Sequence, residues 1–331
     1  MSLPAPQADA YLRAGIRLPS GTAREPSRAA GERANGERDG YDRLSRSEAG
    51  GWGEGVAMAA GDERVPPGLD VSRPNVARVY DYTLGGKDNY AIDRQMADLS
   101  HEVMPARAGA RANRAFLRRV VRFLVAEAGV RQFIDIGSGL PTQGNVHEVA
   151  QALDPAARVV YVDYDPVVLV HAQALLGRTN TTEVVTADVR RPEEIAGNAT
   201  VRRFLDFDQP IGLLMFAILH HVNDDEDPAG ITRFLCDQLP PGSYLAISHL
   251  HNPGEAHPAY AAMAAEAEKV FAENLGTGRF RSRAEILACF GDLELLEPGL
   301  VPYNDWRPDD GVFPIPEAMR HLALCGVAKK T

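Results

Sequence analysis

Two short apolar segments, each followed by carboxylates, constrain the fold of this chain more than any other feature. Residues 131–139 predict a buried strand that runs into a glycine turn, and residues 159–166 predict a second strand that ends in carboxylates. A glycine turn lets backbone N–H groups approach a ligand closely, and a helix that starts there adds a partial positive charge. An acidic residue at the tip of the next strand, here Asp163, suits a ribose diol. Together these segments predict a nucleoside-cofactor site at the carboxyl ends of parallel strands.

The apolar pattern extends this arrangement along the chain. It predicts further strands, which we place at residues 183–186, 211–217, 244–248, 293–296 and 322–327. Helical patterns separate the strands at residues 146–153, 167–176, 231–238 and 259–274. Such alternation is typical of an α/β protein with a doubly wound, mostly parallel sheet and helices on both faces.

The chain divides by composition into a tail and one domain. Residues 1–65 are rich in Gly, Ala, Arg, Glu, Ser and Pro, so we expect either a disordered tail or a start-site artefact with translation beginning at Met58. Residues 66–331 are predicted to form a single domain, in which residues 66–129 are a helical cap and residues 130–331 a Rossmann-like core. Residues 112–128 predict one long helix of that cap, with apolar side chains on one face.

Bulk composition narrows the class of protein. A hydrophobic content of 45% with 24% charged residues is ordinary for a globular protein. The formal net charge of −10 argues against nucleic acid as a partner, because phosphate binding needs clustered Lys and Arg. Three cysteines without metal-like spacing fit a reducing compartment. Since no apolar run reaches membrane-spanning length, we expect a cytoplasmic protein without a membrane partner. The oligomeric state is left open.

The glycine turn discriminates between nucleoside cofactors. Thr142 stands where the dinucleotide fingerprint needs its third glycine, and Pro141 lacks a backbone N–H for a phosphate. An acidic residue before the first glycine, Asp135, instead suits a ligand with an ammonium group. S-adenosylmethionine carries an ammonium, a carboxylate for the backbone N–H groups of Gly137 and Gly139, and a ribose for Asp163. An NAD(P)-dependent oxidoreductase is the weaker alternative.

These motifs resemble those of a known superfamily. Residues 135–139, 162–166 and 187–188 are similar to the successive cofactor motifs of class I S-adenosylmethionine-dependent methyltransferases. Residues 73–90, 139–142 and 303–308 more narrowly resemble an actinobacterial S-adenosyl methyltransferase family, formerly a domain of unknown function. The resemblance runs from about residue 66 to residue 330. It implies a Rossmann-like fold with seven strands, the last of them antiparallel. It further implies S-adenosylmethionine as cofactor, with Asp188 accepting from the adenine amino group.

The loop after the predicted fourth strand carries the candidate catalytic residues, His220 and His221. His220 occupies the position that resembles the general-base histidine of small-molecule O-methyltransferases. A hydroxyl attacks poorly unless its proton leaves, and imidazole titrates near neutral pH. The alternative is that His220 packs against the cofactor. We therefore expect methyl transfer to a small-molecule nucleophile. Oxygen is favoured over nitrogen, because the amine-methylating Asn/Asp-Pro-Pro-Tyr loop is absent. A non-catalytic, S-adenosylmethionine-binding regulatory protein is the other hypothesis.

A polar, glycine-rich turn at residues 85–90 follows the first helix of the predicted cap. We interpret this turn as a lid, with Tyr80, Lys87 and Asn89 contacting the cofactor or the substrate. The alternative is a helix C-cap with a solvated turn.

Two further clusters have competing interpretations. Three histidines after the predicted fifth strand, at positions 249, 251 and 257, raise the alternative of a metal site. We expect no metal, because no carboxylate or cysteine stands at ligand spacing. The segment 303–308 either walls a substrate pocket or places Trp306 as a plug at the edge of the core.

Overall fold

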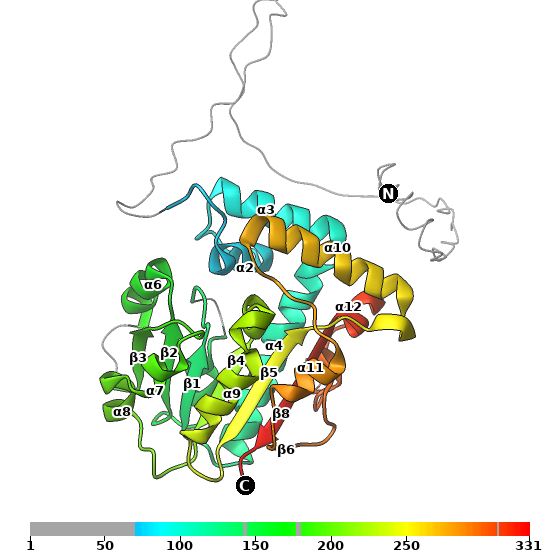
Figure 1. The fold of residues 1–331 in the computed structure, drawn as a ribbon. Coiled ribbons are helices and arrows are strands. Elements are labelled where there is room, and N and C mark those ends of the chain that lie inside the picture. Colours follow the sequence, from blue (N-terminus) through cyan, green and yellow to red (C-terminus); the bar gives the residue numbers. More distant parts are fainter. Residues whose placement is uncertain (1–69, 142–143, 177–179, 310) are drawn as a thin grey trace, which may run out of the picture. The chain divides into compact units, whose positions relative to one another are not determined.

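An eight-stranded sheet lies at the centre of the computed structural model (Figure 1). The structure describes residues 70–141, 144–176, 180–309 and 311–331. The two interpretations of residues 1–65 therefore concern residues outside the described part of the chain.

The strands follow the order β3-β2-β1-β4-β5-β8-β6, with β7 also paired to β8. β1, β2, β3, β4 and β5 are mutually parallel, and β8 runs antiparallel to β5. This arrangement confirms the predicted Rossmann-like α/β fold. The strand bounds are β1 Gln132–Ile136, β2 Arg158–Asp163, β3 Thr182–Thr186, β4 Gly212–Phe216, β5 Tyr244–Leu250, β6 Glu294–Leu295, β7 Val301–Pro302 and β8 Ala323–Lys329.

The sheet has one strand more than the seven expected. β6 and β7 are two residues long, and both pair with β8, at Glu294↔Lys329 and Val301↔Cys325 respectively. The edge of the sheet is thus divided between two short segments. A two-residue strand that contains Pro302 carries no alternating pattern, and this is why the sequence did not reveal it.

Alternate residues of the strands belong to two separate apolar cores. Val159 packs in one core and Val160 in the other, as the period of two requires. On the first face lie α4 (Ala106–Ala126) and α5 (Val146–Gln151). On the second face lie α7 (Pro192–Ala196), α8 (Ala199–Phe204), α9 (Pro228–Asp237) and α11 (Arg283–Ala288). The helix α6 (Pro166–Leu176) follows β2 and contacts β3.

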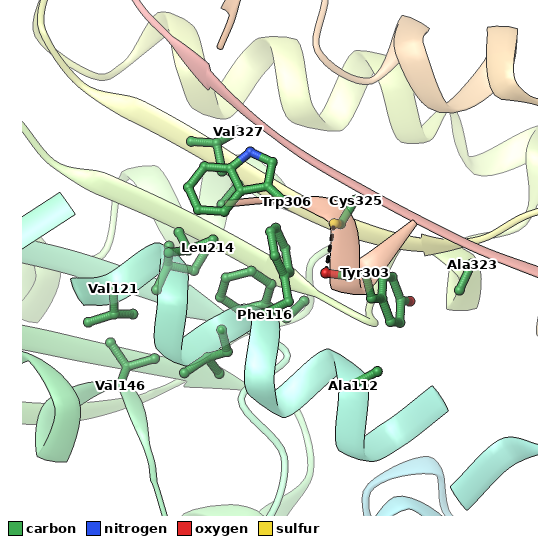
Figure 2. Packing of buried hydrophobic residues seen from close by; sticks show 14 of the residues in the cluster. Ala112, Phe116, Val121, Val146, Leu214, Tyr303, Trp306, Ala323, Cys325 and Val327 are labelled. Atoms are coloured by element: carbon green, nitrogen blue, oxygen red, sulfur yellow. Dashed lines mark hydrogen bonds between the residues drawn. The ribbon is translucent and has the colours of Figure 1, made fainter. Parts of the chain in front are cut away.

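Trp306 is a core residue, which agrees with the second interpretation of its segment. The side chain is fully buried, and its ring makes a T-shaped contact with Phe116 at a centroid distance of 5.6 Å (Figure 2). A second T-shaped contact joins it to Phe123 at 5.7 Å. Arg119 fixes the backbone there, because its Nε donates to the carbonyl of Trp306 (3.0 Å) and its Nη2 to that of Tyr303 (2.6 Å). The neighbouring Tyr303 faces a cavity instead.

A group of helices covers the carboxyl ends of the strands. The helices α2 (Val76–Leu84), α3 (Ala91–Val103) and α10 (Pro258–Leu275) pack together, with α3 and α10 side by side (Figure 1). A short α12 (Glu317–Leu322) contacts α10. The cover therefore combines early and late parts of the sequence. None of the helices in the described ranges has both the length and the apolar composition that crossing a membrane requires.

Candidate functional site

A cavity of about 360 Å³ lies at the carboxyl ends of the parallel strands, within the size range of small-molecule sites. Asp135, Asp163 and Asp188 line it from the ends of β1, β2 and β3. His220 and Leu250 line it from the ends of β4 and β5. Eight of the ten residues predicted for the site are thus brought to one cavity: Tyr80, Asp135, Gly137, Gly139, Asp163, Asp188, His220 and His221.

The predicted glycine turn follows β1 directly. Gly137 and Gly139 have φ values of +69° and +65°, in the left-handed region that favours glycine. At Gly137 a Cβ would also lie 2.5 Å from Cγ1 of Ile218, in the loop after β4. Two features therefore require glycine at position 137: its positive φ angle and the close approach of the loop after β4.

The carboxylate of Asp163 can accept more hydrogen bonds than it receives from the protein. Its Oδ2 accepts from the backbone N–H of Gly139 (2.9 Å), and its Oδ1 accepts from that of Asp165 (3.0 Å). Because a carboxylate offers about four acceptor positions, two remain for the hydroxyls of a ribose. Burial raises the pKa of Asp163, and the two backbone hydrogen bonds oppose that rise.

Asp135 is a buried carboxylate in the cavity wall. Burial raises its pKa to about 7, and the positive charge of Arg114 acts in the opposite direction. No hydrogen bond to this carboxylate occurs within the described part of the chain. The guanidinium of Arg114, on α4, lines the same cavity and donates to Oδ1 of Asn145 (3.2 Å). A carboxylate and a guanidinium in one wall fit the ammonium and carboxylate groups of an amino-acid moiety.

The predicted adenine contact, Asp188, is engaged with Arg190. Its carboxylate accepts from Nε and Nη2 of Arg190 at 2.6–3.0 Å. Burial opposes ionisation of Asp188, but these contacts outweigh it and lower the pKa. The Arg190 guanidinium also lies 5.7 Å from the ring centroid of Tyr164, which is half exposed. Asp188 faces the cavity, and its contact with adenine stays a prediction.

Tyr80 belongs to a hydrogen-bond network that the sequence did not reveal. Its hydroxyl donates to the carbonyl of Ala110 (3.3 Å) and accepts from Nδ2 of Asn113 (3.0 Å). The Ser248 hydroxyl donates to Oδ1 of Asn113 (2.6 Å) and accepts from the N–H of Ala217 (2.9 Å). The network joins α2, α4 and β5 to the loop after β4. Asn113 stands among arginines and alanines and Ser248 in an apolar strand, so only the fold shows that they meet.

Lys87 and Asn89 lie outside the cavity lining. Lys87 is exposed, and Nδ2 of Asn89 donates to Oδ2 of Asp81 (2.9 Å) and to the carbonyl of Gly86 (3.1 Å). The Asp81 carboxylate occupies the space that a Cβ of Gly86 would need. A hydrogen bond between Asp81 and Asn89 therefore closes this turn. This fits the alternative interpretation, a helix C-cap with a solvated turn. A ligand contact of Lys87 or Asn89 stays a prediction.

A buried ion pair joins the helices on either side of this turn. Nε of Arg78 donates to Oδ2 of Asp93 at 2.7 Å, and both side chains are buried. Asp93 also accepts from the backbone N–H groups of Asn75 and Tyr90 (2.9 Å each). Several residues of the segment 73–90 thus hold α2 and α3 together.

His220 and His221 lie on η1 (Leu219–His221), the turn after β4. Their ring centroids are 4.4 Å apart, and Nδ1 of each ring is buried without a hydrogen-bond partner among the described residues. Burial lowers the pKa of His220 well below its ordinary value and that of His221 to about 4. Both imidazoles are therefore neutral near pH 7, and both residues line the cavity.

His249 is held in one tautomer behind His220. Arg281 donates from Nη1 to Nε2 of His249 (3.0 Å), and His249 Nδ1 lies 2.6 Å from the carbonyl of Leu250. Because a guanidinium cannot accept a hydrogen bond, the proton of His249 is on Nδ1. Burial lowers the pKa of His249 to about 3. In the described ranges, no group of three or more His, Cys, Asp or Glu side chains is arranged to hold a metal ion.

Comparisons with known proteins identify the family. The sequence profile described as S-adenosyl methyltransferase matches residues 62–331. The chain belongs to the S-adenosyl methyltransferase family. It is therefore an S-adenosylmethionine-dependent methyltransferase, as predicted, and the oxidoreductase alternative does not fit this family. The cavity residues Asp135, Arg114 and Asp163 fit the charged groups and the ribose of this cofactor.

Two solved structures are similar to this methyltransferase over most of its length. A protein from Thermobifida fusca YX that is assigned as a methyltransferase shares 46% identity with a TM-score of 0.74, covering 80% of this chain and 98% of its own. A DUF574 family protein from Streptomyces avermitilis MA-4680 shares 39% identity with a TM-score of 0.71, covering 78% and 98%. No curated protein matches this chain.

Proposed function

We propose that this methyltransferase transfers the methyl group to an oxygen atom of a small molecule, with His220 as the general base. The observation that carries the proposal is the buried, neutral imidazole of His220 in the cavity wall. A neutral imidazole can take the proton of a hydroxyl, whereas an uncharged amine attacks without prior deprotonation. A base at this position therefore favours oxygen as the acceptor atom.

The reaction conserves charge within the cavity. S-adenosylmethionine supplies a methyl group bound to a positively charged sulfur. The acceptor oxygen forms the new bond to the methyl carbon, and the carbon–sulfur bond breaks with its electron pair left on sulfur. The hydroxyl proton passes to the imidazole of His220. The positive charge thus moves from sulfur to imidazole, and no additional charge is created in a buried site. His221 lies beside His220 and adds no charge while it stays neutral.

The cofactor is proposed to lie along the ends of β1, β2 and β3. Asp135 would accept from its ammonium group, Arg114 would contact its carboxylate, and Asp163 would accept from its ribose. The backbone of Gly137 and Gly139 allows the close approach that this placement needs. That the protein has no nucleic-acid partner and that it is cytoplasmic both stay predictions.

Methyl-labelled turnover tests the proposal. The full chain is incubated with trideuteromethyl-labelled cofactor and a set of hydroxylated and aminated small molecules, and the products are located by mass spectrometry. We expect oxygen-linked label, and we expect His220→Ala to lower turnover by about 100-fold or more while S-adenosylhomocysteine affinity stays within about twofold. Nitrogen-linked label, or full turnover by the variant, would contradict the assignment of acceptor and base.

A further inference from the structure

The charged groups of the cavity are confined to one half of it. Every carboxylate and guanidinium among the described lining residues comes from α4 or from the ends of β1, β2 and β3. They are Arg114, Asp135, Asp163, Asp165, Asp188 and Arg190. The half that extends under β4, β5, α2 and α10 is lined by apolar and uncharged polar side chains. Its apolar members include Val79, Phe216, Leu250, Phe271 and Met319.

The uncharged half contains buried polar side-chain atoms. Nδ1 of His220, Nδ1 of His221 and Oγ1 of Thr277 are all buried without a hydrogen-bond partner among the described residues. All three residues line the cavity. The segment that carries Thr277 lies along η1, because the N–H of Arg279 donates to the carbonyl of His220 (2.7 Å). Two imidazoles and a hydroxyl in this half suit a ligand with an uncharged hydrogen-bonding group.

Two arginines that contact η1 already have other partners. Arg281 donates to His249, to two backbone carbonyls and to Oδ1 of Asp224. Arg279 pairs with Asp224 and Glu268 at 2.8 Å each. Neither arginine lines the cavity. A charged acceptor would therefore lose its hydration without gaining a counter-charge, which is unfavourable in a buried site.

From this separation of charge we propose that the acceptor is an uncharged, mostly apolar molecule that carries a hydroxyl group. The inference rests on the proposed function and specifies its substrate class. The hydroxyl meets the imidazole of His220, and the rest of the molecule lies against the apolar walls under α2 and α10. Carboxylated, phosphorylated and ammonium-bearing acceptors are excluded from this half.

Three probes of one shape test the proposal. Binding of 2-naphthol, 2-naphthoate and 2-naphthylmethylamine to the S-adenosylhomocysteine complex of the full chain is measured by calorimetry at pH 7.5. We expect 2-naphthol to bind about tenfold or more tightly than either charged probe. Equal binding of the three, tighter binding of a charged probe, or no binding of 2-naphthol would overturn the inference.

A charge-introducing variant provides a second, independent measurement. Thr277→Arg places a guanidinium beside η1, and the matched control Thr200→Arg places one on α8, away from the cavity. We expect Thr277→Arg to raise the affinity for 2-naphthoate about tenfold, while Thr200→Arg leaves it unchanged. An unchanged affinity in a folded Thr277→Arg protein would count against the placement of the acceptor.

These outcomes separate the inference from the proposed function. Loss of S-adenosylhomocysteine binding would concern the cofactor site and not the acceptor. Binding of 2-naphthol without methylation would contradict His220 as the base, while the preference for an uncharged acceptor would stand.

Discussion

Replacing Asp135 by Asn is predicted to stabilise the protein without ligand, by an amount that depends on pH. Burial raises the pKa of this carboxyl to about 7 from its ordinary value of 3.8. The folded state therefore holds the proton more tightly than the unfolded state. The stability that this group contributes is fully present below about pH 4 and is lost as the pH rises through about 7.

The magnitude follows from the difference in pKa. At about pH 8, the ionised group lowers the free energy of unfolding by about 4 kcal/mol, because the pKa differs by about three units at about 1.4 kcal/mol each. At about pH 5.5, the same reasoning gives about 2 kcal/mol. Asn cannot ionise and has nearly the same shape. The stability gain of Asp135→Asn should therefore grow by about 2 kcal/mol between the two pH values.

Urea denaturation of both proteins at the two pH values measures this gain. Taking the difference between the proteins cancels the titration of all other groups that the substitution leaves unchanged. A gain that is equal at both pH values, or larger at the lower one, would refute the reasoning. With saturating S-adenosylhomocysteine the order should reverse, because its ammonium then compensates Asp135 and the Asn variant lacks that contact.

Three further predictions concern the frame around the site. Gly137→Ala should lower the free energy of unfolding by about 2–4 kcal/mol, because its Cβ would clash with Ile218. Gly139→Ala should lower it by only about 1 kcal/mol, because a Cβ at position 139 meets nothing within 4 Å. Equal losses in urea melts would contradict this difference. Trp306→Ala should cost about 3–5 kcal/mol, which a denaturant midpoint reports, and a loss below about 1 kcal/mol would disagree with its burial. The three cysteines are buried, and burial raises the pKa of Cys236 to about 12 and that of Cys289 to about 11. Native protein should therefore react slowly with a thiol reagent at pH 8, unlike urea-unfolded protein, and rapid labelling of the native protein would argue against that packing.

The parallel half of the sheet could be predicted from sequence because its signals are local. The strands β1 to β5 are each at least five residues long and contain consecutive apolar residues, and the motifs that line the cavity lie at or directly after the ends of β1, β2 and β3. Topology then brings the ends of neighbouring parallel strands together without further information. The predictions for Asp135, Gly137 and Asp163 needed only this rule.

The residues that the sequence did not reveal depend on contacts between distant segments. Arg114 and Asn113 lie on α4 with ordinary helical neighbours, and only the packing of α4 against β1 and β5 directs them to the cavity. Lys87 and Asn89 show the converse case. Their turn is rich in functional groups, but the carboxylate of Asp81 accepts hydrogen bonds from the backbone N–H of Asp88 and the side chain of Asn89. These bonds hold the turn away from the cavity lining. Residue type and density do not indicate which way a turn faces.

The walls of the cavity come from stretches of chain that are far apart in sequence. Val79 lies before the first strand, Phe271 follows the fifth, and Met319 precedes the last. A molecule whose parallel strands have formed but whose α10 and α12 have not docked lacks the walls that would enclose the acceptor. Binding of the acceptor therefore stabilises the completely folded chain, by mass action, more than partly folded forms. In a cell with ample acceptor, completely folded enzyme would thus be better protected from proteolysis than partly folded enzyme.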